Sequence, residues 1–273
     1  MPSRIAFADL DGTLLSYDNS SWEESRAGID ALKAAGIPLI FASSKTRREM
    51  ETWRKRIGNT DPYIVENGGA LLIPSTWKPM PHRATQVAHG VNRVEIGVPL
   101  ARLRAALREI SAELGAGLRG FGDLSREELT EHSGLSGEDL ENALAREYDE
   151  PFIAAQALTG GQKAHLARLA RARWLNVSRG GRFFHLTGPT SKARAAQVLL
   201  EAMTPPFTII AAGDAPNDLE LLQIAHHQIV VAQTDGTHAP DLMRSLPKAL
   251  FTQGIGPAGF SEGILTVLRE TAI

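Results

Sequence analysis

The sequence of 273 residues contains no cysteine. Disulfide bonds, a thiolate nucleophile and a zinc site built on cysteine are therefore excluded. Long apolar runs are also missing, and the amino-terminal stretch MPSRIAFADLDGT reaches an acid after only four apolar residues, Ile5 to Ala8. A transmembrane helix and a signal peptide are not expected from these patterns, and we predict a cytoplasmic protein.

A strong net charge is missing as well. Lysine and arginine number 29 against 31 acidic residues, which gives a formal charge of -2. No strong field therefore favours a nucleic acid or a membrane as partner, and a small-molecule substrate is expected instead. The composition, with 43% hydrophobic and 22% charged residues, is that of a globular chain long enough for one large and one smaller domain.

Short apolar runs alternate with helical patterns from residue 3 to about 80, and again from 190 to the carboxyl terminus. Strands that alternate with helices indicate a parallel sheet covered on both faces. The near-continuous apolar runs IPLIFA and FTIIAA are typical of strands buried on both faces. We predict an α/β fold whose core is a Rossmann-like, doubly wound parallel sheet.

The pattern changes after Pro79 and Pro81. Short strands with polar alternation are expected at 93–98, 118–121, 148–154, 174–178 and 182–186, with helices near 99–115, 125–145 and 161–173. We interpret 85–186 as an inserted α+β module with a mostly antiparallel sheet, which leaves 1–84 and 187–273 as the core. The module is expected to join the core near 76–83 and 187–190.

Polar residues follow the expected core strands, at the edge where open parallel sheets bind ligands. Two acids, Asp9 and Asp11, come after the first strand. Like charges at this spacing repel, and each costs several kcal/mol when it is buried without a partner, so we expect a cation between them. The later strands are followed at this edge by Ser43, Ser44, Lys45, Glu66, Asn67 and the sequence GDAPND at 213–218.

Four motifs in this order resemble those of the haloacid dehalogenase superfamily of phosphohydrolases. They are DLDGT at 9–13, Ser43 after an apolar strand, Lys192 near the start of a helix, and GDAPND. The long insert is similar to the large cap of the subgroup that hydrolyses sugar phosphates. More narrowly, FASSKTRREM, VENGGA, REYDEPF and RGGRFFHLTG resemble the mannosyl-3-phosphoglycerate phosphatase family. The resemblance implies a catalytic core with an inserted α+β cap domain.

The resemblance also implies roles for the four motifs. Asp9 would attack phosphorus and form an aspartyl phosphate, and Asp11 would protonate the leaving oxygen and then take a proton from water. Ser43 would donate to a phosphoryl oxygen, and Lys192 would neutralise developing charge. Mg²⁺ is the expected cofactor, held by Asp9, the main-chain carbonyl of Asp11, Asp214, and Asp218 directly or through water.

Candidates for substrate binding surround these residues. Asp149 and Glu150 are expected to bind sugar hydroxyls, although on an edge strand they could equally be solubilising charges. Arg182 is the candidate for a substrate carboxylate, which a guanidinium meets with two parallel hydrogen bonds. Arg182 and His185 fall on opposite faces of an ideal strand. The candidates in the core are Thr13, Ser44, Lys45, Glu66, Asn67, Gly68 and Asn217.

The expected function is Mg²⁺-dependent hydrolysis of mannosyl-3-phosphoglycerate or glucosyl-3-phosphoglycerate to the glycosylglycerate, a compatible solute, and phosphate. The same residues also fit a phosphatase of another sugar phosphate, such as sucrose phosphate or a hexose phosphate, and a phosphomutase. A non-catalytic sugar-phosphate sensor is disfavoured, because a sensor has no use for a nucleophile such as Asp9. The choice between mannosyl and glucosyl substrates and the oligomeric state stay open.

Overall fold

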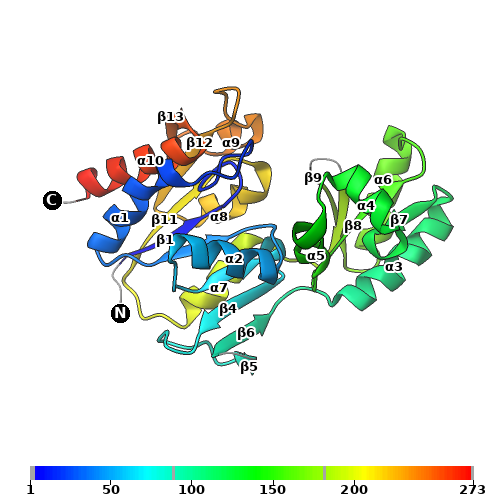
Figure 1. Cartoon of the computed structure of the whole chain (residues 1–273), viewed down its shortest axis with the longest axis horizontal. Helices are drawn as coiled ribbons and strands as arrows, with labels where there is room; N and C mark the ends of the chain where they lie inside the picture. The colour runs from blue at the N-terminus through cyan, green and yellow to red at the C-terminus, as the bar shows by residue number, and fades with distance from the viewer. Residues whose placement is uncertain (1–3, 88–89, 181–182, 272–273) are drawn as a thin grey trace.

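The computed structural model describes residues 4–87, 90–180 and 183–271. Figure 1 shows two lobes: the first and last parts of the chain form one, and the middle of the chain, in green, forms the other. The chain passes between the lobes twice, so the smaller lobe is an insertion in the larger one.

The larger lobe is built on a mixed sheet. Its strands lie in the order β13-β12-β11-β1-β2-β3-β4-β6-β5, parallel from β13 to β3 and antiparallel beyond. Their bounds are β1 Arg4–Ala8, β2 Leu39–Ala42, β3 Tyr63–Val65, β4 Ala70–Pro74, β5 Thr85–Val87, β6 Val91–Glu95, β11 Thr208–Gly213, β12 His227–Ala232 and β13 Leu250–Ile255.

Helices cover both faces of this sheet, as expected for a doubly wound fold. Alternate residues of β1 face opposite sides: Ile5 and Phe7 pack towards α7, α8 and α9, whereas Ala6 and Ala8 pack towards α1, α2 and α10. Among the described residues, no helix is long and apolar enough to cross a membrane. The helices are α1 Arg26–Ala34, α2 Arg47–Ile57, α7 Lys192–Glu201, α8 Leu219–Gln223, α9 Pro240–Ser245 and α10 Gly256–Glu270, with short 3-10 turns at Glu23–Ser25, Glu66–Gly68 and Pro216–Asp218.

The smaller lobe has an antiparallel sheet in the order β7-β8-β10-β9, made of Leu118–Gly120, Asp149–Ala154, Phe183–Thr187 and Asn176–Gly180. On one face pack α3 (Leu100–Leu114) and α6 (Gly160–Arg171), through a cluster that includes Leu107, Leu166 and Phe152. The other face carries α4 (Arg126–Ser133) and α5 (Gly137–Leu144) over Ile153 and Phe183. A 3-10 turn at Phe121–Asp123 precedes α4.

The single helix predicted for 125–145 is therefore two helices. Gly134 ends α4 in the left-handed conformation with φ +77°, and Gly137, at φ +55°, starts α5. Glycine adopts this conformation without the steric cost that a side chain would bring. The break turns α5 towards α2 of the larger lobe, where the Thr46 hydroxyl donates to the Asn142 carbonyl at 2.7 Å.

One predicted strand belongs to the other sheet. The pattern at 93–98 was expected in the inserted module, but β6 pairs antiparallel with β4 of the larger sheet, with Val94 opposite Leu71. Both side chains are buried, so the strand contributes to the core of the larger lobe. By this pairing the chain leaves the larger sheet after Glu95, not near 76–83, and it returns after Thr187.

The packing of α10 on the sheet leads to a test of the fold. A Cβ on Gly263 would lie 2.3 Å from Cγ2 of the buried Ile229 in β12. We expect Gly263→Ala to lower the free energy of unfolding by about 1–3 kcal/mol through overpacking, measured by urea denaturation. Gly160→Ala, at the first residue of α6 with nothing within 4 Å, is the control, since both variants share the helix propensity of alanine. Equal stability of the two variants would contradict this close packing.

Candidate active site

Two neighbouring parallel strands bring the first and last acidic motifs together. Asp9 follows β1 and Asp214 follows β11, and these strands pair in register up to Ala8 opposite Ala212. The amide of Asp9 continues this pairing by donating to the Ala212 carbonyl at 3.0 Å. Motifs separated by about two hundred residues in the sequence therefore meet at one edge of the sheet.

Lys192 lies between two of the acids. Its Nζ atom is 2.7 Å from Asp9 Oδ1 and 2.7 Å from Asp218 Oδ1, and all three side chains are buried. Burial alone would lower the pKa of Lys192, but the attraction of Asp218 and Asp9 outweighs it and the pKa is raised. The position of Lys192 is set by α7, which starts at this residue and is capped by the Ser191 hydroxyl.

Asp9, Asp214 and Asp218 form a group that could hold a metal ion. One ligand atom of each lies within 4.8 Å of the others. Burial raises the pKa of Asp9 well above its usual range, with Lys192 opposing and the three other acids adding to the rise. Burial and Asp218 raise the pKa of Asp214 to about 7. One ammonium does not balance this charge, and carboxylate oxygens are ligands that Mg²⁺ prefers, so the residues fit a divalent cation.

Asp218 is already well supplied with donors. Besides Lys192, it accepts hydrogen bonds at Oδ2 from the amides of Asp214 and Ala215, at 3.2 and 3.1 Å. Gly213 leaves the room for this turn, because a Cβ there would lie 2.5 Å from the Asp218 Cβ. Asp218 therefore orients Lys192 and shapes the GDAPND loop.

Asp214 is oriented from the first loop. The Thr13 hydroxyl donates to Asp214 Oδ1 at 3.3 Å, and the Tyr17 hydroxyl donates to Oδ2 at 3.4 Å. Thr13 is fully buried and supports Asp214, and its expected contact with a substrate stays a prediction. Tyr17 was missed, since nothing in the sequence distinguishes it from an ordinary surface tyrosine.

Asp11 is separated from this group and has its own lysine. Lys45 Nζ lies 2.9 Å from Asp11 Oδ1. Burial lowers the pKa of Lys45, but the attraction of Asp11 and Glu49 outweighs this and raises it. We expected a cation between Asp9 and Asp11, and the structure gives each acid a separate ammonium: Lys192 for Asp9 and Lys45 for Asp11.

The loops after β2 and β3 are joined by backbone hydrogen bonds. The amide of Asn67 donates to the Ser43 carbonyl and the amide of Glu66 donates to the Lys45 carbonyl, both at 3.0 Å. Asn67 also accepts at Oδ1 from Asn217 Nδ2 at 3.1 Å, which links this pair of loops to the GDAPND loop. The structure thus brings together the four loops that the sequence placed at one edge.

The inserted lobe brings Asp149 to these loops. Asp149 is fully buried at the start of β8, and its Oδ2 lies 2.9 Å from Arg146 Nη1 and 2.8 Å from His185 Nδ1. Arg146 Nη1 also donates to the Ser44 carbonyl at 3.3 Å. The other oxygen of Asp149, Oδ1, is buried and has no partner among the residues that the structure describes. Arg146 was missed, although it lies three residues before Asp149 in the phrase REYDEPF.

Glu150 is not part of this group, although Asp149 and Glu150 were expected together at a sugar. Side chains alternate along a strand, and Glu150 points to the opposite face of β8. There its carboxylate accepts from Arg104 Nε at 3.0 Å and from the Gly122 amide at 3.2 Å. Burial raises the pKa of Glu150, and these two donors oppose the rise.

Two further candidates, Glu66 and Gly68, have other surroundings than expected, and a third is not among the described residues. The Glu66 carboxylate is fully buried and accepts hydrogen bonds from main-chain amides of the inserted lobe, so it does not face a substrate. Gly68, at φ +96°, is packed against the Ser191 carbonyl, and its own carbonyl accepts from the Thr190 hydroxyl at 2.5 Å. Arg182 lies outside the residues that the structure describes.

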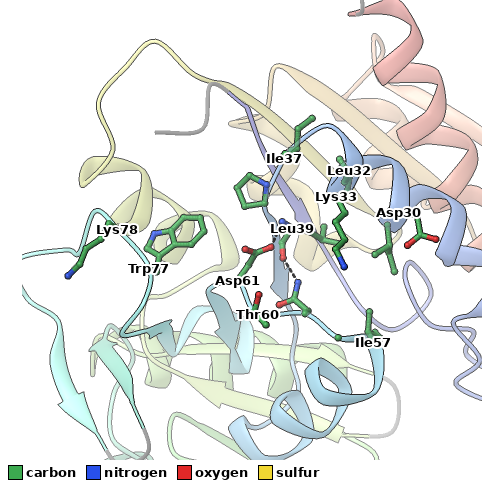
Figure 2. A pocket seen from close by; sticks show the side chains of 15 residues that line it. Asp30, Leu32, Lys33, Ile37, Leu39, Ile57, Thr60, Asp61, Trp77 and Lys78 are labelled. Atoms are coloured by element: carbon green, nitrogen blue, oxygen red, sulfur yellow. Dashed lines mark hydrogen bonds between the residues drawn. The ribbon is translucent and has the colours of Figure 1, made fainter.

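A separate cavity of about 690 Å³ lies away from these residues (Figure 2). It is lined at the amino-terminal ends of β2 and β3 by Leu39, Thr60 and Asp61, and by Trp77 and Lys78 of the chain beyond β4. In parallel sheets these ends lie opposite the edge where the acidic motifs meet. None of the candidate catalytic or binding residues lines this cavity.

Comparison with known proteins shows the family to which the chain belongs. Residues 6–88 match the model of the haloacid dehalogenase-like hydrolases. The glucosyl-3-phosphoglycerate/mannosyl-3-phosphoglycerate phosphatase of Methanococcoides burtonii is 34% identical over 269 residues, which are 97% of either chain. The chain belongs to the mannosyl-3-phosphoglycerate phosphatase family of haloacid dehalogenase-like hydrolases. It is therefore a phosphoric monoester hydrolase, as the motifs predicted.

Two further matches extend this result. The mannosyl-3-phosphoglycerate phosphatase of Pyrococcus furiosus is 32% identical over 232 residues, or 84% of this chain and 90% of that protein. A phosphatase of the same superfamily from Bacteroides thetaiotaomicron has a solved structure that superimposes with a TM-score of 0.68 at 16% identity, covering 98% of this chain and 95% of that one. At this identity the likeness shows the fold alone, and it confirms the predicted core with an inserted cap. The cap is the smaller lobe.

The crowding of acids predicts how stability depends on metal and pH. The pKa of Asp214 is about 7 in the folded protein against a usual 3.8, so its contribution to stability is present below pH 3.8 and is lost as the pH rises through 7. Without metal, the melting temperature should therefore fall between pH 6 and pH 8. Mg²⁺ replaces the proton, so its stabilising effect should be larger at pH 8 than at pH 6.

Thermal melts with EDTA or with excess MgCl₂ at both pH values measure this difference. Asp214→Asn is the matched variant, because it removes the charge and keeps the shape. Its melting temperature should change less between pH 6 and pH 8 than that of the wild-type protein, with Asp9 still titrating, and it should respond weakly to Mg²⁺. An Mg²⁺ effect of the same size at pH 6 and pH 8, or none in the wild-type protein, would rule out a cation bound by these ionised acids.

Proposed function

We propose that this phosphatase hydrolyses mannosyl-3-phosphoglycerate or glucosyl-3-phosphoglycerate, releasing the glycosylglycerate and phosphate. The relatives with these activities in their names align along the core and the cap. The observation that carries the proposal is the group formed by Arg146, Asp149 and His185, which the cap holds against Ser44 at the end of β2. It provides polar groups beyond the phosphate, where a sugar and a glycerate would extend.

Asp9 is the proposed nucleophile. An oxygen of Asp9 bonds to phosphorus while the bond from phosphorus to the glycerate oxygen breaks in line, which leaves an aspartyl phosphate. Lys192 contacts Asp9 Oδ1, so Oδ2 is the oxygen that we assign to the attack. Lys192 also offsets the negative charge that develops on the phosphoryl group, and the Ser43 hydroxyl donates to one of its oxygens.

Asp11 is the proposed acid and base. It protonates the departing glycerate oxygen, and it then takes a proton from the water that hydrolyses the aspartyl phosphate. Its side chain is 31% exposed, which leaves it open to the leaving group and to water, in contrast to the buried Asp9. The contact with Lys45 holds the carboxylate in place between the two steps.

The buried acids would hold Mg²⁺ beside the nucleophile. Asp9, Asp214 and the main-chain carbonyl of Asp11 are the proposed ligands, with Asp218 contributing through water because its oxygens already accept from Lys192 and two amides. When bound, the cation screens the charges of carboxylate and phosphate, which otherwise repel each other.

The groups beyond the phosphate meet the cap. Asp149 Oδ1 is a buried acceptor with no partner in the described part of the chain, and a sugar hydroxyl is a donor that would satisfy it. Lys45 stays a candidate for contact with the substrate from the core side. Arg182 stays the residue that we propose for the glycerate carboxylate.

A panel of phosphate esters tests the proposed substrate. We expect kcat/KM for the two glycosyl phosphoglycerates to exceed that for sucrose phosphate, mannose 6-phosphate and p-nitrophenyl phosphate by roughly 100-fold, since polar groups of the cap would stay unpaired with the poorer substrates. The readout is free phosphate. A larger kcat/KM for another sugar phosphate would reassign the substrate, and phosphoryl transfer without release of phosphate would indicate a mutase.

Substitution of the two neighbouring acids separates their roles. Asp9→Asn should still fold and bind the substrate, so with substrate present it should melt at the same temperature as the wild-type protein. It should form no acyl phosphate and release no phosphate, because an amide is a poor nucleophile. Asp11→Asn should slow release by roughly 10² to 10⁴, the usual contribution of a positioned acid or base. Asp30→Asn, at an exposed acid of α1, is the control and should keep full activity. Turnover by Asp9→Asn at the wild-type rate would exclude Asp9 as the nucleophile.

A further inference from the structure

Glu66 is an acidic residue that the mechanism above does not use. It directly follows β3 of the core, and its side chain is fully buried. The carboxylate reaches the cap, where Oε1 accepts from the Glu147 amide at 2.9 Å and Oε2 accepts from the Tyr148 amide at 2.8 Å. A buried carboxylate is costly unless it is hydrogen bonded, and these two amides supply the bonds.

The backbone around Glu66 is held in an uncommon conformation. Glu66, Asn67 and Gly68 all have positive φ angles, of +48°, +54° and +96°. Residues with a side chain rarely adopt this region, and a cluster of such residues needs support from its surroundings. The support here comes from the main-chain bonds to Ser43 and Lys45, which are the residues next to the reacting groups. Glu66 is therefore joined through its backbone to the active-site loop and through its carboxylate to the cap.

The two amides that Glu66 binds lie between the cap residues of the site. Arg146 precedes Glu147, and Asp149 follows Tyr148. The Tyr148 side chain is fitted closely to the core: a Cβ on Gly69 would lie 2.5 Å from the Tyr148 Cβ, and one on Gly97 would lie 2.9 Å from it. The segment from Arg146 to Asp149 thus lies directly on the core, and Glu66 binds its two central main-chain amides. Its side chains make further contacts with the core: Arg93 donates to the Glu147 carboxylate at 2.6 Å, the Tyr148 hydroxyl donates to Glu95 at 3.0 Å, and Arg146 donates to the Ser44 carbonyl at 3.3 Å.

We propose that Glu66 is a positioning residue that sets where Arg146 and Asp149 stand above the active-site loop, and that it thereby governs selectivity for substrates with a large group beyond the phosphate. The inference rests on the proposed function of this site. Glu66 does not touch the substrate and takes no part in phosphoryl transfer. Its loss should therefore affect a glycosyl phosphate and spare a small aryl phosphate, which does not need Arg146 or Asp149.

The test compares Glu66→Ala and Glu66→Gln on two substrates, the panel ester with the highest wild-type kcat/KM and p-nitrophenyl phosphate. Glu66→Ala should lower kcat/KM for the first by roughly ten- to a hundredfold, mainly through KM, since two hydrogen bonds to a charged group are lost. It should change kcat/KM for the aryl phosphate by less than about threefold. Glu66→Gln should recover most of the loss, because one amide oxygen can accept from both main-chain amides, as Glu66 Oε2 does now at 3.1 and 2.8 Å.

Asp61→Ala is the matched control. Like Glu66, Asp61 has a carboxylate that accepts from a main-chain amide, that of Leu39 at 2.8 Å, but Asp61 is only partly buried and lies at the opposite edge of the sheet, beside the cavity of Figure 2. This variant should lower stability without changing the ratio of kcat/KM between the two substrates. A changed ratio in Asp61→Ala would show that general loosening of the core alters selectivity, and would overturn the assignment to Glu66.

Hydrogen–deuterium exchange gives a readout that does not depend on the substrate. The amides of Glu147 and Tyr148 should exchange faster in Glu66→Ala and at nearly the wild-type rate in Glu66→Gln. Unchanged exchange, no loss with the preferred ester, or equal losses on both substrates would each overturn the inference. Failure of the proposed function would show in the substrate preference of the wild-type protein, without any variant. If the wild-type protein prefers a different sugar phosphate, the comparison of the Glu66 variants uses that ester. If it prefers the aryl phosphate, selectivity by the cap is refuted as well.

Discussion

The interaction on which the structure depends is the repulsion among acids at the carboxyl ends of β1 and β11. Asp9, Asp214 and Asp218 are buried with ligand atoms within 4.8 Å of one another, and among the described residues only Lys192 forms ion pairs with members of this group. Such a group is unfavourable in a low-dielectric interior unless positive charge and hydrogen-bond donors are brought to it. The start of α7, the Thr13 hydroxyl and the amides of the GDAPND loop meet this need.

The same constraint explains why the two acids of DLDGT can serve different chemistry although one residue separates them. Asp9 is buried against Lys192, whereas Asp11 is partly exposed against Lys45. A nucleophile benefits from a fixed position in a dry environment, and an acid that exchanges protons with a leaving group and water needs access. Separate lysines, one at the start of α7 and one in the loop after β2, provide both conditions.

The core and the place of its candidate site could be predicted because the evidence is local. DLDGT and GDAPND each follow an apolar strand directly, so the sequence itself shows where that strand ends. The errors come from non-local structure. The polar alternation at 93–98 predicts a strand but not its partner, and pairing with β4 places it in the larger sheet. Likewise, the sequence does not distinguish Asp149 from Glu150, because the partner of each, Arg146 or Arg104, is brought to its face of β8 only by the tertiary fold. The proposed role of Glu66 could not be predicted from the sequence, because it depends on a contact between the core and the cap.

The division of labour between the lobes follows from these contacts. In the proposed mechanism the groups of the core address only phosphorus, the leaving oxygen and the metal, so they would not discriminate among phosphate esters. Discrimination needs groups at a defined distance from phosphorus, and an inserted lobe on two connections would place them loosely. A buried carboxylate that joins the Ser43–Lys45 loop to the amides beside Asp149 removes that freedom. If Glu66 positions the cap as proposed, its bonds to the Glu147 and Tyr148 amides let a residue of the core set the distance from phosphorus to Asp149.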